Sequence, residues 1–158
     1  MRLPQLKPLS DRLLRLQAMS LFATLDVREL RIVDGLLHER QYQQDEVIFD
    51  EGEDGQAIYF VFAGKVSICR QGQPASGRIA ELGPGNFFGE LALLDNSPRA
   101  AQARAATACS LGVFFRMDFQ ELLETNARTS SKLSLQLARY LGARLRDTVH
   151  GARAEQHL

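Results

Sequence analysis

The hydrophobic pattern of this chain changes its period twice, and that change restricts the fold more than any other feature of the sequence. In "DVRELRIVDGLL" (26–37) the apolar residues Leu30, Val33 and Leu37 recur at helical spacing. Between residues 41 and 116 the apolar residues form short runs instead, such as "AIYFVFAG" and "KVSICR", and glycine-containing turns separate them. After residue 116 the helical spacing returns. The pattern predicts helices at both ends and a β structure between them.

The β segment holds enough runs for about seven or eight short strands, which is typical of a small antiparallel sandwich, jelly roll or barrel. We expect one domain over 1–158, with N-terminal helices in 1–40, the strands in 41–116 and C-terminal helices in 117–158. One of the turns is expected at "QGQPASG" (71–77). A chain of 158 residues can bury an ordinary core without disulfides or metals.

The helical segments carry recognisable boundary signals. We expect one or two helical turns in 9–16, and a capping box in which Asp26 caps the next helix while Glu29 reaches back to it. Asp118 is the expected cap of "MDFQELLETN", which ends at Asn126. In the last helix an apolar row recurs every four residues and must be buried against something; it consists of Leu133, Leu137, Leu141, Leu145 and Val149. The row could cover the strands as a lid, or it could pair with a second copy of the chain.

Composition excludes several classes of function. The 19 Lys and Arg balance the 19 Asp and Glu, which argues against a generic nucleic-acid or anionic-membrane surface. No apolar run is long enough for a membrane span, and two distant cysteines, Cys69 and Cys109, favour a cytoplasmic protein with reduced thiols. The three histidines stand alone and none falls between residues 41 and 116, so we expect no metal site, and a cupin-like metalloenzyme is disfavoured. No nucleophile and base form a recognisable motif, so we expect no catalysis.

The stretch "GELALLDNSPRAA" (89–101) combines groups that suit an anion beside a hydroxyl. The segment "LALLD" (91–95) after Gly89 and Glu90 predicts a single helical turn, and its leading N–H groups, beginning at Leu91, have no intrahelical partners. Arg99 offers a planar fork for phosphate oxygens, and Glu90 can accept from a hydroxyl. The small residues that follow Arg99 would let a ligand approach the backbone. A phosphate one sugar ring away from a hydroxyl describes the ribose-phosphate end of a nucleotide.

This stretch, as "FFGELALLDNSPRAA" (87–101) preceded by "RIAELGPGN", resembles the phosphate-binding cassette of the cyclic-nucleotide-binding domain. That family includes catabolite-activator-type regulators, cyclic-nucleotide-dependent kinase regulatory subunits and nucleotide-gated channels. The similarity extends from residue 20 to the C-terminal helices. It implies a mainly β fold with flanking α-helices, an antiparallel β-roll of double-stranded jelly-roll type.

The resemblance also implies a role for each cassette residue. Glu90 would accept from the ribose 2′-hydroxyl, and Gly89 would let the sugar come close. Arg99 would pair with the cyclic phosphate, assisted by the amides of Ala100 and Ala101. Leu82 matches a position that often touches the base. The residues permit blander readings: Glu90 could cap the short helix, Arg99 could pair with the acidic turn residues of 45–54, and Leu82 could be ordinary core.

Two departures from the family pattern bear on binding. Gln102 stands where the family usually has Ser or Thr, and could face outward or add a polar group near the ligand. Asp45 stands where the family often has a glycine, in a turn that would need positive φ. Members that prefer cyclic GMP commonly have a threonine directly after the cassette arginine, so Ala100 favours cyclic AMP. On the last helix, Arg139 and Tyr140 could reach the base, although packing or solvent roles are the simpler interpretation.

We therefore expect a non-catalytic sensor that binds a cyclic nucleotide, with cyclic AMP favoured over cyclic GMP, and whose C-terminal helices change position when the ligand binds. The resemblance suggests a homodimer through the last helix and an effector protein that the sequence does not name. The segment after that helix is too short for a helix-turn-helix, so we expect no direct DNA binding by this chain and no membrane partner. Two alternatives stay open: an orphan interaction module without nucleotide, and the sensor part of a longer transcription regulator.

Overall fold

The computed structural model describes residues 7–156, without the side chains of 74–76 and 152–156. The ends of the expected domain, 1–6 and 157–158, lie outside the described residues. The helices are α1 (Asp11–Gln17), η1 (Ser20–Phe22), α2 (Val27–Leu36), η2 (Glu90–Leu93), α3 (Arg116–Thr125) and α4 (Ala127–Gln156). The strands are β1 (His38–Tyr42), β2 (Val47–Phe49), β3 (Ala57–Ala63), β4 (Val66–Arg70), β5 (Gln73–Leu82), β6 (Phe87–Phe88), β7 (Gln102–Ala105) and β8 (Cys109–Phe115).

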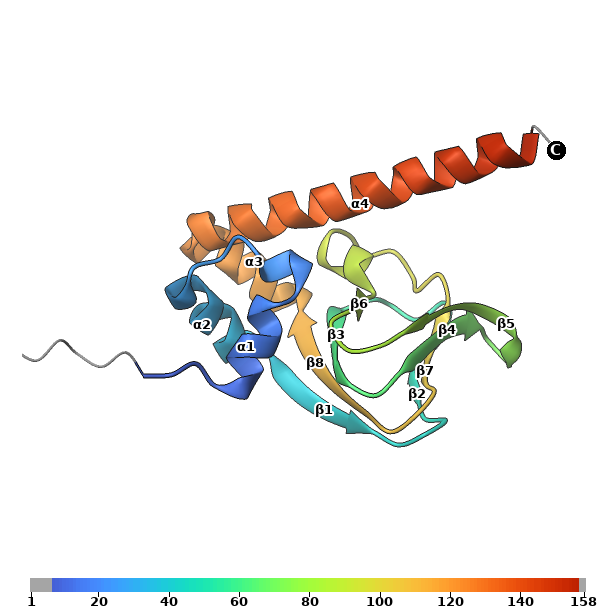
Figure 1. The fold of residues 1–158 in the computed structure, drawn as a ribbon, viewed down its shortest axis with the longest axis horizontal. Coiled ribbons are helices and arrows are strands. Elements are labelled where there is room, and N and C mark those ends of the chain that lie inside the picture. The colour runs from blue at the N-terminus through green and yellow to red at the C-terminus, as the bar shows by residue number, and fades with distance from the viewer. Residues whose placement is uncertain (1–6, 157–158) are drawn as a thin grey trace, which may run out of the picture.

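The strands form two antiparallel sheets, in the orders β1-β8-β3-β6 and β2-β7-β4-β5. The sheets face each other as a β-roll, and the helices gather at one end and along one side (Figure 1). The expected mainly β fold with flanking helices is therefore confirmed.

The strand β3 is buried on both faces, and this explains why its sequence is a continuous apolar run. Ile58, Phe60 and Phe62 pack with the helices, whereas Tyr59 and Val61 pack inside the roll. Because side chains alternate along a strand, one strand separates two cores. Phe22 of η1 packs on Phe60 with the ring centroids 4.9 Å apart, which fixes the N-terminal helices against the roll.

The expected capping box at the start of α2 is confirmed, but the first strand begins before residue 41. Asp26 accepts from the Glu29 amide and Glu29 returns a bond to the Asp26 amide, which completes the capping box. The segment 38–42, partly expected to be helical, is strand β1, which pairs with β8 from His38 opposite Val113. Four of its five residues are exposed. An edge strand with so little burial carries no apolar alternation, and the sequence pattern therefore gave no signal.

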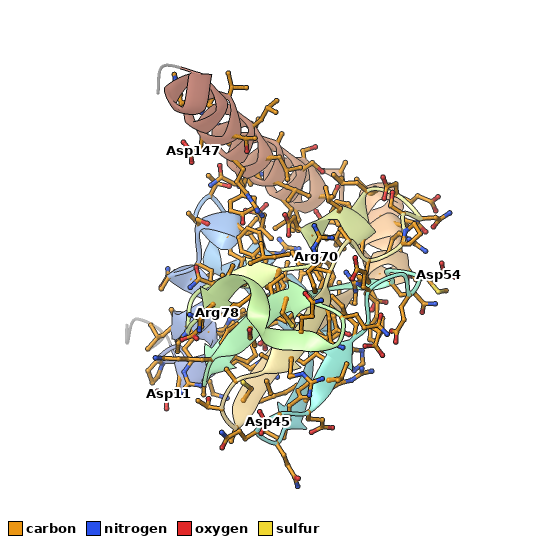
Figure 2. All side chains as sticks on the ribbon, turned by 90° about the vertical axis from the view of Figure 1, so that its right-hand side faces the viewer. Asp11, Asp45, Asp54, Arg70, Arg78 and Asp147 are labelled. Carbon is orange, nitrogen blue, oxygen red and sulfur yellow. The ribbon has the colours of Figure 1, made fainter. Side chains whose placement is uncertain are left out.

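Two turns between strands contain residues with positive φ, and one of them is shorter than expected. Asp45 adopts φ 68°, which confirms the positive-φ turn at the end of the roll away from α4 (Figure 2). The turn expected over 71–77 is shorter, because Arg70 already pairs with Gln73 and β5 begins there. Gly72, at φ 75°, lets a two-residue connection reverse the chain.

The third helix begins two residues before its expected cap. Phe115 is the N-cap and makes no side-chain capping bond, while Asp118 lies inside the first turn. Strand β8 leads into α3 without a loop. The Arg116 amide donates to Gln56 O at 2.8 Å, and the Arg116 side chain donates to Gly55 O and Asp95 O. These bonds hold the start of the helix against the segment that precedes β3 and the segment that follows η2. The last residue of the helix is Thr125, one before the expected end, and Asn126 is the C-cap, whose side chain accepts from the Thr129 amide at the start of α4.

The apolar row on α4 is buried only along its first half. Leu133 and Leu137 are 3% and 2% exposed, whereas Leu145 is 66% and Val149 44% exposed. The second half of α4 extends past the roll, with Asp147 near its outer end (Figures 1 and 2). Periodicity predicted an apolar face, but the roll is too short to cover all of it. No helix within residues 7–156 is long and apolar enough to cross a membrane.

Candidate functional site

The site begins where strand β6 ends and the chain turns sharply into η2. Gly89 adopts φ 72°, a left-handed conformation that side chains disfavour. A Cβ on Gly89 would also lie 2.5 Å from Arg99 Nη1. Two separate features therefore require a glycine at this position: the backbone conformation and the arginine that packs over it.

Four hydrogen bonds with backbone atoms hold Arg99 in place. Its amide donates to Glu53 O at 2.7 Å, and its carbonyl accepts from the Gly52 amide at 2.8 Å, so the turn after β2 fixes its backbone. Its Nη2 donates to Ala57 O at 2.7 Å and its Nη1 to Gly89 O at 3.1 Å. These two bonds leave further N–H donors on the guanidinium for a ligand.

The Arg99 guanidinium is buried beside two aromatic rings, those of Phe49 and Tyr59. The residue is 9% exposed, and its Cζ lies 4.1 Å from the centroid of the Phe49 ring. Burial lowers the pKa of Arg99 from its ordinary value, although Tyr59 and the nearby carboxylates act against this. An arginine stays charged under such conditions, and its charge interacts more strongly in a buried site than in bulk water. None of the ion pairs among the described residues involves Arg99, so the expected alternative of a salt bridge to the acidic turn does not hold.

Glu90 is the second charged group of the site. It is 7% exposed, and η2 begins at this residue without a side-chain capping bond. Its Oε1 instead accepts from Arg144 Nη1 of α4 at 3.2 Å. The alternative in which Glu90 merely caps the short helix is therefore not what the structure shows.

Glu90 and Arg99 line one cavity of about 340 Å³, a size usual for a small-molecule site. Seven of the eight predicted site residues line it: Leu82, Gly89, Glu90, Leu91, Arg99, Ala100 and Ala101. Apolar side chains of β4 and β5, among them Ile68 and Ile79, form another part of the wall. The cavity thus combines an apolar wall with two buried charges of opposite sign. Among the described residues, no group of His, Cys, Asp and Glu could hold a metal ion.

Gln102 is the predicted site residue that does not line the cavity. It is 3% exposed, so it does not face outward either. Its Nε2 donates to Asp50 Oδ1 at 2.6 Å, and its Oε1 accepts from Arg104. Ala101 lines the cavity, and Gln102 follows it at the start of β7, where successive side chains point to opposite faces. Gln102 ties strand β7 to the end of β2 and takes no direct part in the cavity.

Helix α4 contributes two residues to the cavity wall, Tyr140 and Arg144. Tyr140 packs on Phe87 with the ring centroids 4.5 Å apart. Its neighbour Arg139 instead donates to Gln136 on the exposed side of the helix. Of the two residues considered from sequence, Tyr140 therefore reaches the cavity and Arg139 does not. Arg144 was missed, and its spacing of four from Tyr140, which places both on one helix face, was the signal that could have found it.

Comparison with known proteins identifies the family. The family model described as "Cyclic nucleotide-binding domain" matches residues 39–126, more than half of the chain. The chain belongs to the cyclic nucleotide-binding domain family. The resemblance inferred from the cassette is thereby confirmed.

The relatives of the domain occur in different regulatory proteins. The chain is 37% identical over 122 residues to a Thermus thermophilus "Cyclic AMP receptor protein". The aligned region covers 77% of this chain and 56% of that protein. The crystal structure of Thermus thermophilus catabolite activator protein matches with a TM-score of 0.74 and 33% identity, over 85% of this chain and 62% of that one. The regulatory domain of Toxoplasma gondii PKA, co-crystallised with cAMP, matches with a TM-score of 0.63 and 29% identity, over 73% and 46%. The chain spans about half the length of the first of these relatives.

Proposed function

We propose that the cavity binds a cyclic nucleotide, with cAMP preferred over cGMP, and that the chain acts as a non-catalytic sensor. The observation that carries this proposal is that Glu90 and Arg99, brought from the two ends of one cassette, line the same cavity. Arg99 and the amides of Ala100 and Ala101 would bind the cyclic phosphate. Glu90, an acceptor-only carboxylate, would accept from the ribose 2′-hydroxyl.

The preference for adenine rests on what the cavity offers to a base. The wall formed by Ile68, Ile79 and Leu82 is apolar and suits the flat face of either purine. Ala100 has no hydroxyl that could bond to guanine. The names of two relatives, a cyclic AMP receptor protein and a kinase regulatory domain crystallised with cAMP, support the same choice.

A sensor must also change something when the ligand binds, and α4 is the element placed to respond. Its first half packs in the core, while Tyr140 and Arg144 contact the cavity. A nucleotide that prefers one position of the helix would shift the population of positions. The exposed Leu145 and Val149 would then be available to a second copy of the chain as a homodimer, or to an effector protein.

We also propose a cellular context for the protein. The two cysteines are buried and not joined in a disulfide, which fits a cytoplasmic protein. We propose that residues 7–156 bind neither DNA nor a membrane directly. The matched region covers 56% of a relative named as a cyclic AMP receptor protein. This coverage supports the first alternative, in which the domain is the sensor part of a longer regulator. An orphan module that binds no nucleotide is the second alternative.

Isothermal titration with cAMP and cGMP tests the proposal directly. We expect cAMP to bind more tightly, and Arg99→Ala to weaken it by about one to two decades, because a charge-assisted contact contributes roughly 1.5–3 kcal/mol. Arg70→Ala is the matched control, since Arg70 is an exposed arginine paired with Glu51 outside the cavity. It should bind as the wild type does.

The two alternatives give different results. If wild-type protein shows no heat with either nucleotide at high micromolar concentration, the orphan module is favoured. If Arg99→Ala lowers the melting temperature but leaves affinity unchanged, Arg99 has only a structural role. Equal or inverted affinities for the two nucleotides would refute the preference for cAMP alone.

A further inference from the structure

The ring of Phe49 lies over the guanidinium of Arg99, and a β-bulge places it there. Between two of its pairs with β7, strand β2 advances two residues, from Val47 to Phe49, while β7 advances one. A regular ladder would set Phe49 opposite Gln102, whose side chain does not line the cavity. The bulge sets it opposite Ala103 instead, and both side chains belong to the core inside the roll. Opposite residues point to the same face of a sheet, so the bulge turns Phe49 inward.

Two other aromatic rings fix the position of the Phe49 ring. Its centroid lies 5.7 Å from that of Tyr59 and 5.9 Å from that of Phe88. Tyr59 and Phe88 stack on each other with an interplanar angle of 11°. Phe49 itself is 8% exposed. Because closely packed side chains have few alternative positions, the ring is a rigid support for the group that lies on it.

The hydrogen bonds of the Arg99 side chain leave its planar group free to tilt. Nη2 donates to Ala57 O and Nη1 to Gly89 O, and the plane can rotate about the line between these two nitrogens. The Phe49 ring, 4.1 Å from Cζ, opposes such a tilt. The Gly55 backbone is also close, because a Cβ there would lie 3.3 Å from both Cζ and Nε. Contact through a face uses none of the N–H donors, which lie in the plane of the group.

A ring also differs from a carboxylate in its effect on the charge. None of the ion pairs among the described residues involves Arg99. An aromatic face attracts a cation through its quadrupole and carries no net charge. A carboxylate in the place of Phe49 would offset the charge of the guanidinium, and a phosphate would then compete with it. The ring therefore holds the group and leaves its full formal charge for an anion in the cavity.

We propose that Phe49 is a positioning residue for Arg99, which it holds ready for the cyclic phosphate before the nucleotide arrives. The proposal rests on the proposed function, because it concerns the phosphate contact of the same cavity. A side chain that is already ordered in the free protein adds no ordering cost to binding. Phe49 lines the cavity but lies outside the cassette, and it acts on the phosphate through Arg99.

The dissociation constant for cAMP, measured by isothermal titration in two backgrounds, tests this role. Phe49→Leu should weaken cAMP by about threefold to tenfold, the effect of ordering one long side chain on binding. In an Arg99→Ala background the same substitution should change the affinity by less than about twofold, because it acts only through the missing arginine. Phe49→Met fills a similar volume without a flat ring and should repeat both results, and it replaces Phe49→Leu if that variant does not fold.

A measurement on the free protein tests the positioning without nucleotide. Exchange of the Arg99 Nε–H proton with water, followed by NMR, should be roughly threefold or more faster in Phe49→Leu than in the wild type, because the guanidinium leaves its place more often. Phe114→Leu is the matched control, because Phe114 is 1% exposed in the core beneath the helices and does not line the cavity. It should alter neither the exchange nor the affinity for cAMP.

Each contrary outcome is distinct. If Phe49→Leu weakens cAMP as much in the Arg99→Ala background as in the wild type, Phe49 is only part of the cavity wall and the inference is wrong. An unchanged affinity, or an equal loss in Phe114→Leu, also overturns it. If the wild type binds no cAMP, the proposed function fails. The Nε–H exchange then still shows whether Phe49 holds Arg99, and equal exchange rates would refute the positioning itself.

Discussion

The cassette and the second half of α4 both line the same cavity, but the fold holds them in opposite ways. In the cassette, Arg99 is 9% exposed and bonds to two backbone carbonyls, so its position follows from the roll itself. On α4, Leu145 is 66% exposed and Arg144 contributes a single ion pair to the cassette. A sensor needs both kinds of region: one that keeps the geometry of the site, and one whose displacement costs little free energy.

The largest difference between regions should appear within α4 itself. Leu137 is 2% exposed in the helical core, and Leu145 is two turns further along the same apolar row. Leu137→Ala should lower the free energy of unfolding by about 2–5 kcal/mol, because it leaves a cavity. Leu145→Ala should change it by no more than about 0.5 kcal/mol. Urea unfolding at low protein concentration measures both.

Comparable losses in the two variants would contradict the division of α4 into a packed and a projecting half. Repeating the Leu145→Ala measurement at high protein concentration adds a second comparison. A loss that appears only there would indicate that this half is buried between two copies of the chain.

The cassette could be predicted from sequence because its parts are local. Gly89, Glu90 and Arg99 lie within one short segment, and the chemistry of each group is readable from its type and order. The structure adds what order alone does not contain: the carbonyls of Ala57 and Gly89 that orient the guanidinium. The contact with Ala57 joins the cassette to strand β3, 42 residues away along the chain, and depends on the fold being complete.

The features that the sequence did not predict depend instead on contacts between segments far apart in the chain. Strand β1 is an exposed edge with no apolar alternation, so only its pairing with β8 defines it. Arg144 belongs to no motif, and its place in the cavity wall follows from where α4 crosses the roll. The apolar row on α4 shows the same limit, because periodicity reveals a face and tertiary structure decides how much of it is covered.

An ion pair between Lys132 and Glu29 also holds the packed half of α4 against α2, and we expect this contact to be sensitive to acid. Lys132 Nζ lies 2.6 Å from Glu29 Oε1, and Thr129 donates to the same carboxylate. Burial acts to raise the pKa of Glu29, but the bond and charge of Lys132 and the Asp26 amide lower it from 4.5 to about 2. Because the folded pKa is below the unfolded one, this stabilisation is complete above about pH 4.5 and is lost as the pH falls toward 2.

Over that window the residue should contribute on the order of 3 kcal/mol to the change in unfolding free energy. Glu29→Gln keeps a side chain that can complete the capping box but removes the titration, so its stability should vary less between pH 4.5 and 2. Asp147→Asn on the projecting half of α4 is the control and should keep the acid dependence of the wild type (Figure 2). An identical pH profile for wild type and Glu29→Gln would show that the charged contact does not fasten the helix.

The smallest predicted effect compares two glycines with the same backbone and different surroundings. Gly89 has φ 72° with Arg99 Nη1 2.5 Å from the position of a Cβ, and Gly72 has φ 75° with open space around it. Alanine at either position should cost roughly 1–2 kcal/mol for the left-handed backbone. Gly89→Ala should cost about 1 kcal/mol more, because the guanidinium must give up a bond to move. It should also weaken cAMP, whereas Gly72→Ala should not. Equal losses of stability with unchanged affinity would mean that the cassette tolerates a displaced Arg99, and the contrast between a fixed site and a movable helix would then have no structural basis.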